Sequence, residues 1–368
     1  MKNLANRVKK IDSSEIRKYF LLASKVKNAI DLTIGQPDFD VPKEIKNAAC
    51  SNIEAGFNFY TPTNGLPELI EKVSRKLRSK NKIGVGNDQI MITSGTTGGI
   101  FLAFMTLANP GDEIVLFDPY FIVYYQLAKM VGAKIKMVDT YPDFQPNIRS
   151  LEKAVSKKTK LIVINSPNNP TGAVYGKDVI KEIVRIARKN QSYILSDEVY
   201  EDFSYDKKNF SPGSIYNLTL TLGGFSKSYS MTGWRIGYAA GPKEVIDQMT
   251  KLQQLSFVCA PSFAQKAAIA ALDFDNSTAI SKYKKKRDIV WNGLKKKYNF
   301  SKPKGAFYLF LRSPYSITKF INDLIKKNVI VIPGNMFSTK KGYFRISYAK
   351  PDSDLVKAVS VLNKLTER

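Results

Sequence analysis

The strongest constraint on the fold is a regular alternation of two hydrophobic patterns between residues 88 and 240. Short apolar runs rich in β-branched residues have strand length, and they alternate with longer segments whose apolar residues recur at helical spacing. The clearest expected helix is KDVIKEIVRIARKN, residues 177–190, and the expected strands lie in DQIMITSG, EIVLFDP, KIKMVDT, KLIVINSP, SYILSDE and LTLTLGG. Strands that alternate with helices predict a largely parallel sheet covered by helices on both faces, which is an α/β fold.

After about residue 270 the pattern changes to that of a smaller α+β unit. A basic helix within residues 281–298 is followed by expected strands in GAFYLFL, NVIVIPG and YFRISYA, with one helix after the first strand and another at the end. An N-terminal helix near residues 14–26, with Ser13 or Ser14 as its N-cap, is expected to pack on the same unit. The chain of 368 residues is long enough for one large domain or for two.

The net charge of +25 raises nucleic acid or another anionic surface as a partner. The basic residues are nevertheless spread along the chain, and the densest block, residues 281–298, also has apolar residues at helical spacing. This combination is typical of the solvated face of an amphipathic helix. Since no nucleic-acid recognition motif accompanies the block, we do not expect a nucleic-acid partner.

The chain contains no histidine, which excludes several classes of active site. A Ser-His-Asp hydrolase, an H-E-x-x-H metalloprotease and any His-ligated metal site all need that residue. No metal is among the expected ligands. Proton transfer is left to Lys, Tyr, Asp, Glu or Cys, which makes a catalytic lysine more plausible. The two cysteines lie far apart, which fits a reducing cytoplasm. The chain has no apolar run of about 20 residues and its start has no signal-peptide pattern, so we expect a cytoplasmic protein without a membrane span.

Four segments that follow expected strands carry the candidate chemistry: TSGTTGGI (93–100), NSPNNPTG (165–172), SDEVY (196–200) and GGFSKSYSMTGWRIGY (223–238). Ligands of parallel sheets bind beyond the carboxyl ends of the strands. The first segment, a glycine- and hydroxyl-rich turn before a helix, suits a phosphate group, although such turns are also common without a ligand. Taken singly, the other three equally fit a rigid turn, a helix cap and a surface lysine.

Together and in this order, the four segments resemble those of the fold-type I pyridoxal-phosphate aminotransferases, and more closely the class I/II type of the aspartate aminotransferase superfamily. The resemblance extends from IGQPDF (34–39) through YTPTNGLPELIE (60–71) to YFRISYA (343–349). It implies an α/β fold with a mostly parallel seven-stranded sheet between helices. It also implies pyridoxal 5'-phosphate as cofactor, and transfer of an amino group from an L-amino acid to a 2-oxo acid by a ping-pong Schiff-base mechanism.

The resemblance further implies a division into two domains. The large, cofactor-binding domain would comprise residues 43–269. The smaller α+β domain would comprise residues 1–42 and 270–368, and would therefore be built from both ends of the chain.

The resemblance assigns the catalytic roles to three residues. Lys227 matches the lysine that forms the Schiff base and then moves the substrate proton, a role that requires a primary amine. Asp197 matches the carboxylate that keeps the pyridine nitrogen protonated. Tyr200 and Asn169 match the groups that hydrogen-bond the ring hydroxyl, and Phe121 matches the aromatic side chain that stacks on the ring, although plain core packing would also explain Phe121.

The remaining candidates bind the phosphate and the substrate. The resemblance places Gly95, Thr96, Thr97, Ser226 and Arg235 at the phosphate, and Gly35, Asn169 and Arg345 at the substrate. Arg345 would bind the α-carboxylate with its two-pronged guanidinium. Tyr60 matches a tyrosine that reaches the phosphate of the other subunit, which implies an obligate homodimer with shared active sites.

The amino donor stays open between aspartate, aromatic and aliphatic amino acids. Some aspartate-specific relatives carry a lysine where this chain has Thr97, which argues against strict dicarboxylate specificity. Four aromatic side chains near the expected pocket would suit an aromatic or aliphatic donor, or belong to the core: Phe121, Tyr124, Tyr125 and Phe257.

Two other functions remain as alternatives. A β-lyase acting on sulfur amino acids would use the same cofactor residues, and it would release pyruvate and ammonia without a 2-oxo acid acceptor. A nucleic-acid-binding regulator built on the same domain is the more remote alternative. Such regulators carry an additional N-terminal DNA-binding domain, and IGQPDF already begins at residue 34, so none is expected here.

Overall fold

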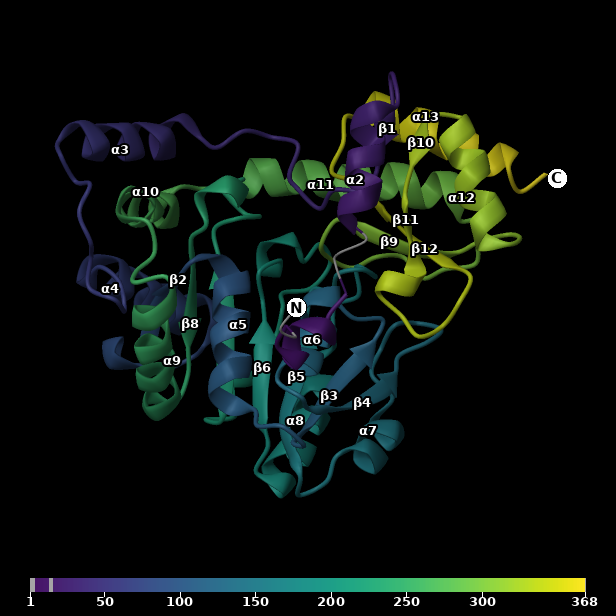
Figure 1. The fold of residues 1–368 in the computed structure, drawn as a ribbon. Helices are drawn as coiled ribbons and strands as arrows, with labels where there is room; N and C mark the ends of the chain where they lie inside the picture. Colours follow the sequence, from purple (N-terminus) through teal and green to yellow (C-terminus); the bar gives the residue numbers. More distant parts are fainter. Residues whose placement is uncertain (1–3, 13–15, 368) are drawn as a thin grey trace.

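A seven-stranded sheet forms the centre of the molecule (Figure 1). The computed structural model describes residues 4–12 and 16–367. In spatial order the strands are β2 (Ile90–Thr93), β8 (Gly237–Ala240), β7 (Thr219–Gly224), β6 (Tyr193–Asp197), β5 (Thr159–Asn165), β3 (Glu113–Asp118) and β4 (Lys134–Asp139). Only β8 runs antiparallel to its neighbours within this sheet. The expected mostly parallel seven-stranded sheet is therefore confirmed, while the four-residue strand β8 was not expected.

Helices cover both faces of this sheet, because its strands are apolar on both sides. One face packs against α5 (Gly95–Leu107), α6 (Ile122–Met130) and α9 (Lys243–Ser256). The other face packs against α7 (Ile148–Ala154) and α8 (Lys177–Asn190). The bounds of α8 are those expected from its pattern, and its apolar residues Ile180 and Ile183 are fully buried.

Three further helices pack beside the β2 edge of the sheet: α3 (Lys43–Glu54), α4 (Pro67–Lys76) and α10 (Ser262–Asp273). Short turns of 3-10 or π helix connect the larger elements: η1 (Leu77–Asn81), η2 (Asn87–Gln89), η3 (Glu201–Phe203), η4 (Pro212–Ser214), η5 (Thr232–Trp234) and η6 (Gly334–Met336). No helix among the described residues is long and apolar enough to cross a membrane.

Segments from near both ends of the chain meet in the unit at the upper right of Figure 1. Its N-terminal elements are α2 (Ile16–Lys25) and β1 (Ile30–Asp31), and β1 pairs in parallel with β10 (Val329–Ile330). The first helix, α1 (Asn6–Lys9), instead lies beside α6 of the large unit. An antiparallel sheet contains β11 (Ile332–Pro333), β12 (Tyr343–Ser347) and β9 (Tyr308–Arg312). The helices are α11 (Ser277–Leu294), α12 (Ile317–Lys326) and α13 (Asp352–Lys364). This α+β unit is the smaller one that the sequence predicted.

The boundaries at residues 42/43 and 269/270 stay a prediction, and the second falls inside α10, which ends at Asp273. The expected N-cap residues Ser13 and Ser14 lie outside the described residues. The helix expected within residues 281–298 is α11, and most of its lysines are exposed. The expectation that its basic block is simply solvated is wrong for Arg287, which is 1% exposed and pairs with Asp206 because the helix crosses the core of the small unit.

Candidate active site

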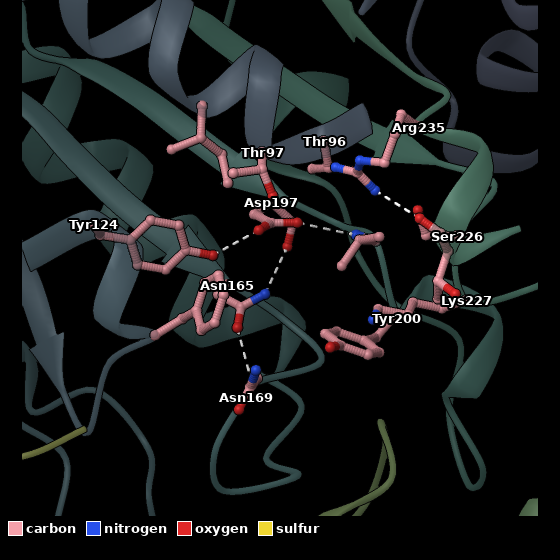
Figure 2. Close-up of a pocket in the computed structure, with 14 residues that line it drawn as sticks. Thr96, Thr97, Tyr124, Asn165, Asn169, Asp197, Tyr200, Ser226, Lys227 and Arg235 are labelled. Carbon is pink, nitrogen blue, oxygen red and sulfur yellow. Dashed lines mark hydrogen bonds between the residues drawn. The ribbon is translucent and has the colours of Figure 1, made fainter. Parts of the chain in front are cut away.

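A cavity of about 120 Å³ lies where β5, β6 and β7 end and α5 begins. Figure 2 shows its lining side chains converging from these strand ends. The lining includes nine of the expected site residues: Thr96, Thr97, Phe121, Asn169, Asp197, Tyr200, Ser226, Lys227 and Arg235. It also includes Tyr124, which was expected near the pocket, and four residues without an expected site role: Ile100, Asn165, Val199 and Thr232. Four expected residues do not line it: Gly35, Tyr60, Gly95 and Arg345.

Lys227 follows the end of β7 and enters the cavity as a partly buried amine. Its Nζ atom donates a hydrogen bond to the backbone oxygen of Gly35 at 2.6 Å. Burial lowers the pKa of Lys227 to about 8, and the positive charges of Arg235 and Arg345 contribute to the decrease. An amine with this pKa is neutral in a useful fraction of molecules near pH 8, so it can act as a nucleophile and as a base.

Asp197 ends β6 with its carboxylate buried in the cavity wall. Its Oδ2 accepts a hydrogen bond from the Tyr124 hydroxyl at 2.6 Å, and its Oδ1 accepts one from the Val199 amide at 3.2 Å. Burial raises the pKa of Asp197, against the opposing effects of these hydrogen bonds and of Lys227. Asp197 forms no ion pair with any described residue, so a cationic N–H group in the cavity would stabilise its charged form.

The opposite end of the cavity suits an anion. The first turn of α5 has no side-chain cap, which leaves amide N–H groups beside the Thr96 and Thr97 side chains. Gly95 has a φ of +71°, and a Cβ atom there would overlap the Arg235 guanidinium. Glycine therefore allows Arg235 to approach the start of the helix, and Ser226 adds a hydroxyl to the same cavity. A phosphate group is the anion that such a helix N-terminus, hydroxyl and arginine fit.

Arg345 is buried behind the cavity on β12. Its Nη1 donates to Asn169 Oδ1 at 2.9 Å and its Nη2 donates to the Thr33 backbone oxygen at 2.5 Å, whereas its Nε has no partner. Arg345 is only 3% exposed, yet it forms no ion pair with any described residue. A buried guanidinium without a carboxylate partner is suited to a carboxylate ligand.

The expected aromatic residues divide into two groups. Phe121 and Tyr124 line the cavity, but the Tyr124 hydroxyl is bound to Asp197. Tyr125 stacks on Tyr120 and Phe257 packs edge-on against Phe101, outside the lining. Of the four aromatic side chains, only Phe121 and Tyr124 therefore contact the cavity.

Tyr60 lies apart from the cavity within a single chain. It precedes α4, and it is 78% exposed. Its proposed contact with a phosphate would therefore require a second subunit.

Asn165 was not predicted from the sequence, but it contacts two other site residues. Its Oδ1 accepts a hydrogen bond from the Asn169 amide at 2.8 Å, and its Nδ2 donates one to the Asp197 backbone oxygen at 3.1 Å. The feature of the sequence that could have indicated Asn165 is its position as the first residue of NSPNNPTG, one of the four candidate segments.

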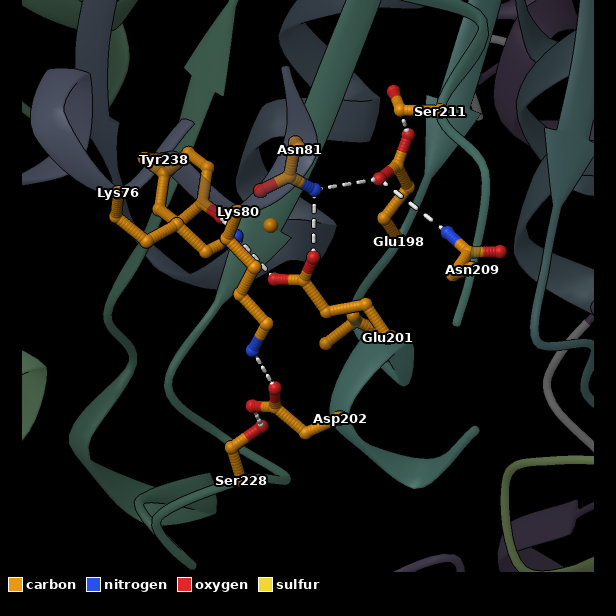
Figure 3. A network of polar contacts seen from close by, with 12 residues as sticks. Lys76, Lys80, Asn81, Glu198, Glu201, Asp202, Asn209, Ser211, Ser228 and Tyr238 are labelled. Carbon is orange, nitrogen blue, oxygen red and sulfur yellow. Dashed lines mark hydrogen bonds and ion pairs between the residues drawn. The ribbon is translucent and has the colours of Figure 1, made fainter. Parts of the chain in front are cut away.

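A partly buried polar network lies beside the segment that follows β6 and contains Tyr200 (Figure 3). Glu201 pairs with Lys76, and Asp202 pairs with Lys80 and accepts from the Ser228 hydroxyl. Ser228 directly follows Lys227. The network thus fixes the β6–η3 segment and the lysine-bearing segment against each other.

Glu198 is the carboxyl group of this network whose pKa is raised. It accepts hydrogen bonds from Ser196 at 2.9 Å, from Ser211 at 2.5 Å and from Asn81 at 3.1 Å. Burial raises the pKa of Glu198 from 4.5 to about 7, and the Glu201 carboxylate adds to the rise. Between these pH values the folded chain keeps a proton that the unfolded chain has released, so Glu198 makes the free energy of unfolding fall as pH rises.

In Glu198→Gln, the free energy of unfolding is therefore expected to fall less than in wild type as pH rises from 5 to 7.5, because glutamine does not titrate. Urea unfolding of both proteins across this range, at one protein concentration, measures the difference. The control Glu182→Gln changes a half-exposed glutamate on α8 and should keep the wild-type pH dependence. Equal pH dependence in Glu198→Gln and wild type would contradict the assignment.

Comparison with known proteins identifies the family. A family model described as aminotransferase class I and II matches residues 27–362. The probable aspartate aminotransferase of Methanocaldococcus jannaschii is 39% identical over 376 residues, covering 99% of this chain and 100% of the relative. The aromatic-amino-acid aminotransferase 2 of Thermococcus litoralis is 38% identical over 380 residues, covering 98% of each.

The fold leads to the same family. The structure of the aspartate aminotransferase from Thermus thermophilus with maleate superposes with a TM-score of 0.95 at 34% identity, over 99% of this chain and 100% of that chain. The aromatic aminotransferase from Pyrococcus horikoshii superposes with a TM-score of 0.89, also at 34% identity, over 96% of this chain and 98% of that one. The chain belongs to the class I and II aminotransferases, and it is an enzyme that transfers amino groups between amino acids and 2-oxo acids.

Proposed function

We propose that the cavity binds pyridoxal 5'-phosphate, the cofactor on which this family depends. The observation that carries the proposal is the arrangement along one cavity: an anion site at the start of α5, an amine whose pKa is lowered at Lys227, and an unpaired buried carboxylate at Asp197. When bound, the cofactor supplies an aldehyde that takes up the amino group and a ring that accepts electrons.

The proposed binding residues follow from this geometry. The start of α5 with Gly95, Thr96 and Thr97 would bind the phosphate together with Ser226 and Arg235. Asp197 would hold the proton of the ring nitrogen, and the Tyr124 and Val199 hydrogen bonds would keep its carboxylate in place. Tyr200 and Asn169 would hold the ring oxygen, and Phe121 would stack on the ring.

Lys227 is proposed to move the substrate proton. Its neutral Nζ would take the proton from the α-carbon of the amino acid and return it during the same half of the reaction. The positive charges of Arg235 and Arg345 favour the neutral amine that this task needs. Arg345 would bind the α-carboxylate, and the Gly35 segment, whose backbone oxygen lies 2.6 Å from Lys227 Nζ, would close the substrate side.

The reaction is proposed to be ping-pong, because one cavity must serve the donor and the acceptor in turn. One relative is named for aspartate and another for aromatic amino acids, so the donor stays open between these classes and the aliphatic ones. These relatives are named as aminotransferases, and neither the β-lyase nor the nucleic-acid-binding alternative gains support from them. A cytoplasmic location stays a prediction.

The enzyme is proposed to be a homodimer with shared active sites. Tyr60 and its neighbour Phe59 are largely exposed, as is Leu255 at the end of α9. Large apolar side chains exposed in this way favour a protein interface. Sedimentation at micromolar protein concentration tests the proposal, and a monomer would contradict it.

The experiment that tests the function is an absorbance spectrum of the purified protein with pyridoxal phosphate, before and after addition of single amino acids. A visible band of the bound cofactor is expected, and donor amino acids should shift it to shorter wavelength as the amino group is taken up. The amino acids that cause the shift identify the donor class. A protein that gives no visible band, even with added cofactor, would contradict the proposed function.

A further inference from the structure

Tyr308, the first residue of β9, makes a contact with the site that the sequence analysis did not anticipate. It is 1% exposed, and its hydroxyl oxygen lies 2.7 Å from the hydroxyl oxygen of Tyr200. Tyr200 lines the cavity, whereas Tyr308 does not. Tyr308 thus contacts a cavity residue from behind, from the sheet of the small α+β unit.

The ring of the same tyrosine contacts the buried arginine. The guanidinium carbon of Arg345 lies 4.8 Å from the Tyr308 ring centroid and 4.6 Å from the Phe337 ring centroid. The two aromatic faces therefore hold the guanidinium through cation–π contacts. Its Nη1 then reaches Asn169, which lines the cavity.

A third contact involves the backbone at Gly35. A Cβ atom at that position would overlap the Tyr308 hydroxyl. The backbone can therefore pass this close to Tyr308 only because residue 35 is glycine. The backbone oxygen of Gly35 accepts the hydrogen bond from Lys227. Tyr308 is thus in contact with Tyr200, Arg345 and Gly35, three residues from separate parts of the sequence.

The direction of the hydrogen bond between the two hydroxyls decides what Tyr200 can do. Each hydroxyl carries one proton. If Tyr200 donates to Tyr308, its proton is no longer available to a group in the cavity. If Tyr308 donates, the Tyr200 oxygen accepts and the Tyr200 proton is free to point into the cavity.

The surroundings of the two hydroxyls favour Tyr308 as donor. Burial raises the pKa of both hydroxyls. The Arg345 charge opposes the rise in the pKa of both hydroxyls, and the Asp197 carboxylate adds to the rise for Tyr200. The buried Tyr308 hydroxyl has no other hydrogen-bond partner among the described residues, whereas Tyr200 also faces the cavity. A Tyr308 proton that did not point to Tyr200 would be buried without an acceptor, so the proton of the shared bond belongs to Tyr308.

We propose that Tyr308 is a positioning residue: its hydroxyl donates to Tyr200 and turns the Tyr200 proton toward the cavity, while its ring holds Arg345 in place. The inference rests on the proposed function, in which Tyr200 holds the ring oxygen of the cofactor and Arg345 binds the carboxylate. One side chain would then orient a cofactor-binding group and a substrate-binding group together.

The first test is Tyr308→Phe in the cofactor-loaded enzyme, which removes the hydroxyl and keeps the ring. A Tyr200 hydroxyl without its donor stabilises a ring oxygen anion less well, so the pH midpoint of the visible absorbance band should rise by about half to one pH unit. The value of kcat should fall several-fold, while KM for the donor changes little because the ring still contacts Arg345. An unchanged midpoint would overturn the proposal.

A double-mutant comparison separates positioning from a general structural effect. In a Tyr200→Phe background, Tyr308→Phe is expected to cause no further shift of the midpoint, because the residue through which it acts is gone. Two shifts that simply add would overturn the proposal. Tyr308→Leu, which also removes the ring, should raise KM for the donor about tenfold beyond the effect of Tyr308→Phe, since Arg345 loses one cation–π contact.

The matched control is Tyr348→Phe. Tyr348 is fully buried in the same core, but its hydroxyl donates to the Ala306 backbone oxygen at 3.0 Å. Its removal should leave the midpoint unchanged, and an equal shift in this variant would overturn the inference. A wild-type enzyme without a visible band would contradict the proposed function itself, whereas a wild-type band with an unshifted Tyr308→Phe band contradicts only the role of Tyr308.

Discussion

Lys227→Ala is expected to lower kcat by at least about 10⁴-fold, because it removes the amine proposed to bind the cofactor and the base proposed to move the substrate proton. No other lysine lines the cavity within the described residues, so no neighbouring amine can take its place. Steady-state turnover with a donor found by absorbance measures the loss. Retained turnover would refute the assignment of Lys227.

Two comparisons show that such a loss is chemical. Lys227→Arg keeps a positive charge but has no primary amine, and it should be as inactive as the alanine variant. Lys208→Ala removes an exposed lysine and should retain wild-type turnover. Activity in Lys227→Arg would mean that the site needs only the charge.

The same substitution has an expected effect on stability. Because burial lowers the pKa of Lys227 from 10.5 to about 8, the unfolded chain binds a proton between these values that the folded chain has released. Wild-type stability therefore rises with pH across this window, and below pH 8 the buried amine destabilises the fold. Lys227→Ala should be at least as stable as wild type at pH 7 and should lose this rise, which thermal unfolding at pH 7 and pH 10 would detect.

The sequence predicted the regular elements where one pattern dominates. Helix α8 was predicted with its observed bounds because its apolar residues lie on one face between polar ones. Helix α5 was expected from Ile100, yet it begins at Gly95. Its first turn contains glycine and threonine, which favour helices weakly, so packing against the sheet determines where it starts.

The contacts of the site were predictable only in part. Asp197 ends β6 and Lys227 follows the end of β7, so strand position and the motif resemblance together predicted that both lie at the site. The hydrogen bonds of Tyr124 to Asp197 and of Tyr308 to Tyr200 connect residues 73 and 108 positions apart. No local pattern specifies such pairs, because the first depends on how α6 packs on the large sheet and the second on how the small sheet packs against the large unit.

Arg345→Lys is expected to lower kcat/KM for the amino donor by about 10²-fold, mainly through a higher KM. A charged hydrogen bond contributes about 1.5–3 kcal/mol, and a lysine cannot reproduce the planar guanidinium that meets a carboxylate with two parallel bonds. Lysine also cannot bind Asn169 and Thr33 while offering a further donor in the same plane, as Arg345 does with its unpaired Nε.

The decisive comparison is between donors with and without an α-carboxylate. A primary amine without an α-carboxylate cannot use Arg345, so wild type and Arg345→Lys should convert it equally slowly in the half-reaction followed by absorbance. Arg312→Lys, on the neighbouring strand β9 at an exposed position, should leave kcat/KM for the donor unchanged. If Arg345→Lys kept the wild-type kcat/KM for amino acids, or lost activity equally with the simple amine, Arg345 would not be the carboxylate-binding residue. A loss confined to amino acids would place the carboxylate at the guanidinium held between Tyr308 and Phe337.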